Sequence, residues 1–247
     1  MIPLKSDEDL QKLRKSGRIL SKVMVNLKEV ILPGVLTSEI NSLAQRLIVE
    51  EGAKPAFKGY RGFPAAVCTS VNEEIVHGIP GKRALCEGDI VGIDLGVNYL
   101  GYFSDAAVTL GVGLVEPDLL KLVEVTKEAL AEGIKKAVVG NRLSDISHRI
   151  QVFVEGNGFS VVRQFVGHGI GLSLHEEPEI PNFGAAHQGP ILKKGMVLAI
   201  EPMVNAGTWE AEILPNGWTA VTKDGSPSAH FEHTIAITED GPQILTN

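Results

Sequence analysis

Two carboxylates lie in a glycine-rich, strand-like part of the chain whose surroundings favour a bound cation. Asp94 and Asp105 belong to two apolar runs within residues 88–111, separated by the four residues 98–101. Because this connector has turn-forming Asn and Gly at its ends, it predicts a β-hairpin in which Asp94 and Asp105 lie directly opposite each other. Like charges placed in this way destabilise a sheet. The pair therefore indicates a metal site, and an exposed hairpin with two surface aspartates is the alternative.

The strand around Asp94 is apolar on one face and nearly empty on the other. Side chains alternate between the faces of a strand, so Asp94 shares its face with Gly92 and Gly96. Four apolar residues occupy the opposite face: Val91, Ile93, Leu95 and Val97. A face kept free of bulk beside a carboxylate is typical of a metal pocket.

An internal repeat supplies two further acids. Residues 88–94 match residues 195–201 and set Asp94 against Glu201, while residues 102–109 match residues 229–236 and set Asp105 against Glu232. A duplicated half-barrel or half-sheet would bring all four acids to one pseudo-twofold axis. Buried ions cost several kcal/mol each without compensation, so the repeat predicts two divalent cations. Chance similarity between short apolar strings is the alternative.

Histidines close to these acids extend the candidate site. His168 lies among three glycines, which exclude a regular helix and allow close backbone packing. An imidazole beside carboxylates favours transition metals over Mg or Ca. His175 follows seven residues later, so it need not bind the same atom. His77 is a third candidate, for which a hydrogen-bonded loop histidine is the alternative.

The remaining histidines and hydroxyls are less informative. His148 and His187 are expected at the surface. His230 and His233 flank Glu232, and His233 on the apolar face is expected to be a core histidine with a satisfied hydrogen bond. Ser104 has no visible base partner, which argues against a nucleophilic serine.

The composition bounds the class of protein. The 247 residues are 44% hydrophobic and 21% charged, as in a globular protein with a substantial core. A net charge of −7 argues against DNA binding. No apolar run is long enough for a membrane span, the first residues do not resemble a secretory signal, and two cysteines do not make a disulfide framework. A cytoplasmic location is the expectation.

The elements that must position the acids are readable from periodicity. Helices are expected over residues 6–32, 37–51, 117–139 and 144–154, with strands between and after them. Ser6 and Asp9 have the spacing of a capping box, Pro117 suits a first helical turn, and Ser144 is expected to cap the last helix. Two helices followed by strands, twice over, predict an α+β fold.

Five stretches together resemble the type I methionine aminopeptidases of the pita-bread metallopeptidases. They are V-N-E-E-I-V-H-G-I-P (71–80), the Asp94 to Asp105 spacing, G-H-G-I-G (167–171) with a histidine at 175, A-I-E-P-M-V-N (199–205) and F-E-H-T (231–234). The resemblance covers essentially the whole chain. It implies one catalytic pita-bread domain, residues 1–247, with pseudo-twofold-related αβ halves of roughly 1–115 and 116–247 around a curved antiparallel sheet.

The resemblance also implies a ligand set for two divalent ions. It consists of Asp94, Asp105, His168, Glu201 and Glu232, in which Asp94 chelates one ion while Asp105 and Glu232 bridge both. Such a pair activates a water and polarises the peptide carbonyl. Co, Mn, Fe and Zn all accept these ligands.

Roles for further residues follow from the same resemblance. Glu201 is implied as general base, His175 as a stabiliser of the oxyanion, and His77 as a contact of the scissile amide. A methionine pocket is implied, lined by Tyr60, Phe63, Cys68 and Trp218 together with His77 and His175. Phe57 and Leu174 depart from the commonest family pattern, which bears on pocket width. A monovalent-cation loop would involve Asn72 and Ser228.

The implied function is removal of the N-terminal methionine from newly made polypeptides, with preference for small second residues. The substrate would be polypeptide N-termini, with transient contact to the ribosome, no DNA or membrane partner, and a monomeric chain. The alternatives are an Xaa-Pro-type pita-bread peptidase, which usually has an additional N-terminal domain, and a non-catalytic pita-bread binding protein, which typically loses metal ligands. A dinuclear phosphoesterase would need basic residues beside the acids. Type II enzymes carry an insertion too long for this chain, in which Glu232 follows Glu201 by 31 positions.

Overall fold

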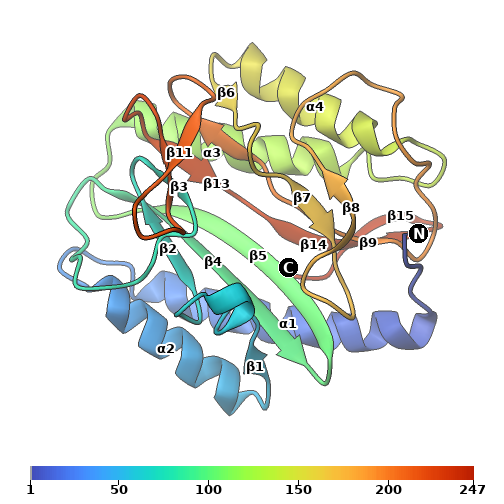
Figure 1. Ribbon diagram of the computed structural model, residues 1–247, viewed down its shortest axis with the longest axis horizontal. Coiled ribbons are helices and arrows are strands. Elements are labelled where there is room, and N and C mark those ends of the chain that lie inside the picture. The colour runs from blue at the N-terminus through green and yellow to red at the C-terminus, as the bar shows by residue number, and fades with distance from the viewer. Residues whose placement is uncertain (1) are drawn as a thin grey trace.

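The computed structural model describes residues 2–247. The first part of the chain forms α1 (Asp7–Glu29), α2 (Thr37–Glu50), β1 (Lys54–Pro55), the 3-10 helix η1 (Tyr60–Gly62), β2 (Cys68–Val71), β3 (Glu74–Val76), β4 (Ile90–Tyr99) and β5 (Tyr102–Gly111). The second part begins with α3 (Pro117–Ile134) and α4 (Leu143–Gly156), followed by β6 (Ser160–Val161), β7 (Gly167–Gly169), β8 (Glu176–Ile180), β9 (Val197–Ile200), β10 (Met203–Asn205), β11 (Ala211–Ile213), β12 (Ala220–Thr222), β13 (Ser228–His230), β14 (His233–Thr238) and β15 (Gly241–Ile244). Both parts therefore run from two helices into strands, as the repeat predicts (Figure 1).

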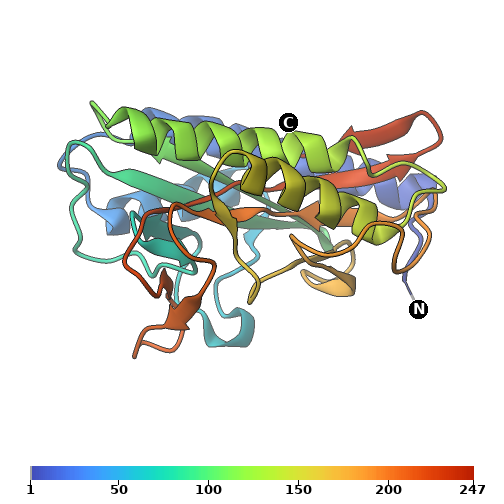
Figure 2. The ribbon, with the colours of Figure 1, turned by 90° about the horizontal axis from the view of Figure 1, so that it is seen from above.

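Every strand pairing in the described chain is antiparallel. The largest sheets have the orders β15-β14-β9-β7-β8 and β1-β4-β2, with β5 added to β4, and two three-stranded sheets have the orders β13-β10-β6 and β11-β12-β3. Figure 2 shows that α1 and α3 cover one side of the strand layer, while η1 and the β11–β12 segment project from the other. In residues 2–247 no helix combines the length and the apolar character that crossing a bilayer requires.

The helices form where the sequence predicts them, with three differences at their ends. Ser6 and Asp9 make the expected capping box, with Asp9 N donating to Ser6 Oγ and Ser6 N donating to Asp9 Oδ2. The first helix ends at residue 29 and the third at residue 134, both earlier than predicted. The predicted cap Ser144 is wrong, because its hydroxyl accepts from Gln188 N at 2.6 Å and the helix begins one residue before it.

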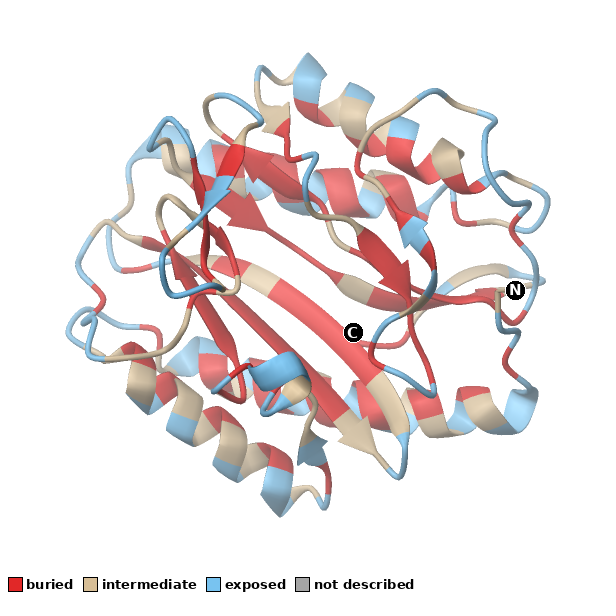
Figure 3. Cartoon of the chain, in the orientation of Figure 1, coloured by how far each residue is buried: buried red, intermediate tan, exposed pale blue. Residues whose placement is uncertain are grey.

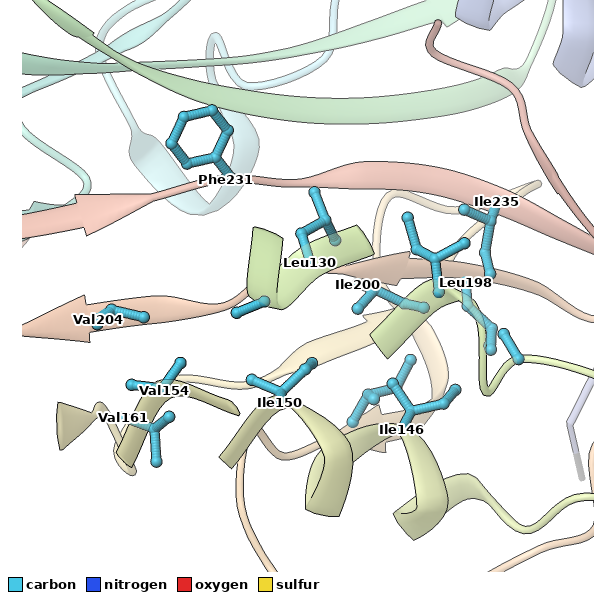
Figure 4. Close-up of a cluster of buried hydrophobic side chains, with 14 of the residues drawn as sticks. Leu130, Ile146, Ile150, Val154, Val161, Leu198, Ile200, Val204, Phe231 and Ile235 are labelled. Atoms are coloured by element: carbon cyan, nitrogen blue, oxygen red, sulfur yellow. The ribbon is translucent and has the colours of Figure 1, made fainter. Parts of the chain in front are cut away.

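Most residues of the strands and of the helix faces turned toward them are buried (Figure 3), and many of these buried residues are apolar. One cluster lies under α1 and α2 and includes the whole predicted apolar face of β4: Val91, Ile93, Leu95 and Val97. Another lies under α3 and α4, where Leu130, Ile146 and Ile150 face Leu198 and Ile200 of β9 (Figure 4). The first cluster thus fixes β4, whose other face carries Asp94, and the second fixes β9, which Glu201 directly follows.

The β4–β5 hairpin differs from the sequence prediction in its register. Tyr99 pairs with Tyr102, so the loop contains only Leu100 and Gly101, both with positive φ angles of 53° and 87°. Such a two-residue turn matches the natural twist of a hairpin. Asp94 therefore pairs with Ala107, and Asp105 with Gly96. The prediction that Asp94 and Asp105 are directly opposed is wrong; they are diagonal neighbours on one face, because a shift of two residues preserves the face.

Two threonine side chains join β5 to the strand region of residues 230–234, and we call this contact the seam. Thr234 Oγ1 accepts from Asp105 N at 2.9 Å and donates to Asp105 O at 2.8 Å. Thr109 Oγ1 accepts from His230 N and donates to His230 O, both at 2.9 Å. Each hydroxyl thus occupies a place that a backbone group fills in an ordinary ladder.

Direct backbone bonds complete the seam between these two hydroxyls. Glu232 N donates to Ala107 O at 2.9 Å, and Ala107 N donates to Glu232 O at 3.4 Å. The seam therefore sets acids of both sequence halves side by side, Asp105 from β5 and Glu232 from the segment before β14.

Glycines beside His168 allow the close backbone packing that the sequence predicts. A Cβ atom on Gly169 would lie 2.1 Å from Glu177 O, and one on Gly167 would lie 2.5 Å from Ala199 O. Both contacts are with backbone, which cannot move aside as a flexible side chain can. His168 is therefore held between its neighbours by the absence of side chains next to it.

Replacement of Gly169 by Ala is expected to lower the free energy of unfolding by roughly 1–3 kcal/mol, the usual cost of overpacking. Urea unfolding of the metal-free protein measures this change. Gly156 is the matched control, because a Cβ there would have no atom within 4 Å. Equal effects of Gly169→Ala and Gly156→Ala would contradict the packing argument.

Candidate metal centre and active site

Five side chains implied as metal ligands converge on one cavity of about 270 Å³. Asp94 comes from β4, Asp105 from β5 and His168 from β7, whereas Glu201 directly follows β9 and Glu232 directly precedes β14. Asp105, His168 and Glu232 each offer one ligand atom within 4.8 Å of the others. The structure therefore brings the five predicted metal ligands together from both parts of the chain.

Three of the buried acids each have one carboxylate oxygen without a hydrogen-bond partner in residues 2–247. Asp94 Oδ1, Asp105 Oδ1 and Glu232 Oε1 have no partner among the described residues. Buried polar atoms in native structures are nearly always paired, so three such atoms in one cavity require an explanation. A cation at this place would satisfy all three.

The electrostatics of the cavity lead to the same conclusion. Burial raises the pKa of Asp94 to about 7 and that of Glu201 to about 7. Burial, and then the charges of neighbouring acids, raise the pKa of Asp105 and of Glu232 well above the ordinary range. These shifts mean that the metal-free cavity disfavours the ionised carboxylates. The residues therefore fit divalent cations, which would reverse the penalty.

His168 is oriented as a metal ligand would be. Its Nδ1 lies 2.9 Å from Gly169 O, and this bond to a carbonyl places the proton on Nδ1. The lone pair of Nε2 is then free to point into the cavity, where Nε2 lies 3.6 Å from Glu201 Oε1. A carbonyl behind a ligating imidazole is the common arrangement in metal sites.

His77 and His175 line the same cavity beside the acids. The ring of His175 lies 4.2 Å from that of His168, and its Nδ1 is 2.9 Å from the Tyr60 hydroxyl. Burial lowers the pKa of His175 to about 3 and that of His77 to about 4. Both imidazoles are therefore neutral near pH 7 and can each donate one hydrogen bond without carrying charge.

The residues implied for methionine binding form one wall of the cavity. Tyr60, Phe63, Cys68 and Trp218 all line it, and the rings of Phe63 and Trp218 meet edge to face at 5.2 Å. Burial, and then the nearby Asp94, raise the pKa of the Cys68 thiol, so this wall stays neutral. An apolar and aromatic lining of this kind suits a thioether.

The two departures from the family pattern also belong to this wall. Phe57 and Leu174 both line the cavity. A Cβ on Gly96 would lie 2.7 Å from the Phe57 ring, so this ring packs directly on Gly96, two residues after Asp94 in β4. A larger residue at position 96 would therefore collide with the Phe57 ring and add bulk to the strand face that carries Asp94.

Several lining residues were missed by the sequence reasoning. Arg61, Gln164, Phe165 and Val166 line the cavity. Their nearness in sequence to Tyr60 or His168 was the only available signal. His230 was noticed beside Glu232 but given no role, although its Nε2 lies 3.5 Å from Glu201 Oε2.

The residues implied for a monovalent cation are neighbours. Ser228 N donates to Asn72 O at 2.9 Å. The Asn72 side chain already bonds Asp89 Oδ1 and Ile90 N. Cation binding by this loop stays a prediction.

A buried ion pair anchors the loop that carries His175. Lys5 Nζ pairs with Glu176 Oε2, and the other oxygen of Glu176 accepts from the amides of Leu172 and Ser173. The side chain of Lys5 is 3% exposed, and a Cβ on Gly171 would lie 2.1 Å from its Cε. The segment before α1 therefore holds the His175 loop in place.

Replacement of Lys5 by Met is expected to lower the free energy of unfolding by about 3–5 kcal/mol, because it leaves a buried carboxylate without its cation. Urea unfolding measures the change. Lys127→Met is the control, since the Lys127–Glu124 pair is exposed and such pairs contribute only about 0–1 kcal/mol. Similar losses in the two variants would contradict the anchoring role.

Comparison with known proteins supports the geometry. Residues 11–239 match the model of the family described as Metallopeptidase family M24. A methionine aminopeptidase of Clostridium perfringens is 53% identical over 246 residues, covering 100% of this chain and 99% of the relative. Methionine aminopeptidase 1 of Bacillus subtilis is also 53% identical, with the same coverage.

Solved structures show the same architecture. The crystal structure of a methionine aminopeptidase from Thermotoga maritima superposes with a TM-score of 0.99 at 48% identity, covering 100% of both chains. A prolidase from Pyrococcus furiosus superposes with a TM-score of 0.80 at 25% identity, covering 99% of this chain but 65% of its own. The predicted α+β pita-bread fold is confirmed. The chain belongs to metallopeptidase family M24, and it is a metal-dependent hydrolase.

Proposed function

We propose that this chain is a methionine aminopeptidase that removes the N-terminal methionine from polypeptides. The observation that carries the proposal is the cavity itself, in which an apolar and aromatic wall adjoins buried acids that have carboxylate oxygens without hydrogen-bond partners in the described part of the chain. The relatives that match the full length of the chain support this choice over other activities of the family.

The proposed metal ligands are Asp94, Asp105, His168, Glu201 and Glu232. Two ions of Co, Mn, Fe or Zn held there would supply Lewis acidity and lower the pKa of water to near neutrality. The count of two is inferred from charge, because four carboxylates balance two dications.

The neighbouring residues would supply the remaining proton transfers and hydrogen bonds. Glu201 would accept a proton from the attacking water and pass it to the leaving amine. His175 is neutral near pH 7, and with its Nδ1 accepting from the Tyr60 hydroxyl it would donate its single N–H, on Nε2, to the developing oxyanion. His77 would contact the scissile amide.

The proposed substrate is the N-terminus of a polypeptide with methionine first and a small residue second. The methionine side chain would lie against Tyr60, Phe63, Cys68 and Trp218. We propose that residues 1–247 act as one catalytic domain, as a monomer in the cytoplasm with transient access to the ribosome. The net charge of −7 supports the absence of a DNA partner.

An assay with three peptides tests the proposal. Metal-free protein is refilled with Co, Mn, Fe or Zn and given Met-Ala-Ser, Ala-Ala-Ser or an Ala-Pro peptide. We expect release of free methionine from Met-Ala-Ser and little cleavage of the other two. Preference for Ala-Pro would instead assign an Xaa-Pro-type peptidase, the alternative that corresponds to the structural likeness to a prolidase. Binding without release would assign a non-catalytic binding protein.

A further inference from the structure

His230 is a buried imidazole that the proposed chemistry does not use. It ends β13, is 3% exposed, and its Nε2 has no hydrogen-bond partner among the described residues. Glu201 Oε2 lies 3.5 Å from this nitrogen, and the buried Asp94 is close enough for its charge to act on the same ring. A buried donor next to an acceptor at this distance needs only a small approach to form a hydrogen bond.

Glu201 consequently lies between two imidazoles, one for each carboxylate oxygen. Oε1 faces His168 Nε2 at 3.6 Å, and Oε2 faces His230 Nε2 at 3.5 Å. The proton of His168 is on Nδ1, where Gly169 O accepts it, so its Nε2 offers a lone pair to a cation. His230 Nε2 lies 3.5 Å from Glu201 Oε2, and a proton on that nitrogen makes it a donor to this oxygen.

The backbone of His230 is fixed independently of Glu201. It pairs with Met203 of β10, and the Thr109 hydroxyl holds both its N–H and its carbonyl at the seam. The position of the imidazole is therefore set by two strands, β10 and β5. A side chain on so rigid a support can orient a partner rather than follow it.

We propose that His230 is a positioning residue for Glu201, whose Nε2–H holds Oε2 so that the carboxylate keeps one orientation toward the metal ligands. This inference rests on the proposed role of Glu201 as ligand and base. A carboxylate without a fixed orientation would spend part of its time turned away from the ions. Partners of this kind behind metal ligands are worth about 10–100-fold in metal affinity or activity.

Variants at His230 separate positioning from simple filling of space. His230→Phe keeps a ring without the N–H, and His230→Gln retains a side-chain N–H donor. His230→Leu is a second apolar variant, used if the Phe variant does not fold. His233→Gln is the matched control. His233 also adjoins Glu232 in sequence, but its Nδ1 lies 2.8 Å from Thr246 Oγ1.

The readouts are cobalt(II) affinity by calorimetry, the visible absorption of the cobalt-loaded protein, and kcat and KM for Met-Ala-Ser. Circular dichroism shows that each variant is folded. We expect the apolar variants to lose about 10–100-fold in cobalt affinity or kcat, with an altered cobalt spectrum and less change in KM. The cobalt affinity and kcat of His230→Gln should stay within a few-fold of the parent values. Those of His233→Gln should equal the parent values.

Parent-like affinity, spectrum and kcat in a folded apolar variant would overturn the inference. Equal losses in the Gln and Phe variants would also overturn it, because the donor would then not be the property that matters. Failure of the parent protein to cleave Met-Ala-Ser would reject the proposed function alone, since cobalt affinity and spectrum still report on His230.

Discussion

Replacement of Glu201 by Gln is expected to lower kcat for Met-Ala-Ser by about 10²–10⁴-fold, the usual contribution of a general acid–base group. The amide has almost the same shape as the carboxylate but cannot accept the proton of water. It is also a weaker ligand, so metal binding should weaken. Steady-state kinetics at saturating cobalt(II) measure the effect on catalysis apart from the effect on affinity.

Glu210→Gln provides the control for this variant, because Glu210 lies outside the cavity lining. Its kcat should equal that of the parent. A Glu201→Gln variant with more than a tenth of the parent kcat would reject Glu201 as the base.

The contribution of the buried acids to the stability of the metal-free protein is expected to fall as the pH rises from about 4 to 7. Burial raises the pKa of Asp94 from 3.8 to about 7 and that of Glu201 from 4.5 to about 7. Within this window the unfolded chain has released carboxyl protons that the folded chain keeps, so the acids' contribution to the free energy of unfolding decreases with pH. The depressed pKa values of His77 and His175 oppose this trend below about pH 6.5, where these histidines take up protons on unfolding. The stabilising contribution is complete below about pH 4 and is lost above about pH 7.

The effect should be large enough for a simple melting experiment. A shift of about three pKa units on one acid corresponds to roughly 4 kcal/mol. In a chain of this size that is on the order of 10 °C in Tm. Scanning calorimetry of the metal-free protein at pH 5 and pH 8 measures the difference.

Metal should reverse the sign of this dependence, because binding requires deprotonated carboxylates and therefore strengthens as the pH rises. Saturating manganese(II) at 100 times its Kd would add about 2.7 kcal/mol of stability. Asp105→Asn is the informative variant. It removes one buried acid, so its metal-free form should melt higher than the parent and gain little from metal. A metal-free parent with pH-independent Tm would contradict the electrostatic description of the cavity.

The candidate acids could be identified from the sequence because side chains alternate regularly between the two faces of a strand. Period-two alternation placed Asp94 opposite an apolar face, and the repeat linked it to Glu201. The register of the hairpin could not be found in the same way. It depends on whether the strand stops before Asn98 or continues through Tyr99, and in the structure it continues, with Asn98 Oδ1 accepting from Gly101 N of the two-residue loop. The energy difference between the two turns is not visible in residue types.

Contacts between segments distant in sequence could not be predicted from the sequence either. Nothing near Lys5 indicates that it would reach Glu176, and nothing near His230 indicates that it would face Glu201. Both contacts arise because separate strands and loops pack together. The Ser144 cap failed for the same reason, since its hydroxyl is used by Gln188, 44 residues away.

The seam has a consequence for the order in which the molecule is assembled. The Thr109 hydroxyl bonds the backbone of His230 in the second half, and the Thr234 hydroxyl bonds the backbone of Asp105 in the first half. The strand edge of each half is therefore satisfied only by the other half. During synthesis the first half emerges with Asp94 and Asp105 before Glu201 and Glu232 exist. Capture of metal by the full set of acids must therefore be a late event, which follows docking of the halves and cannot guide it.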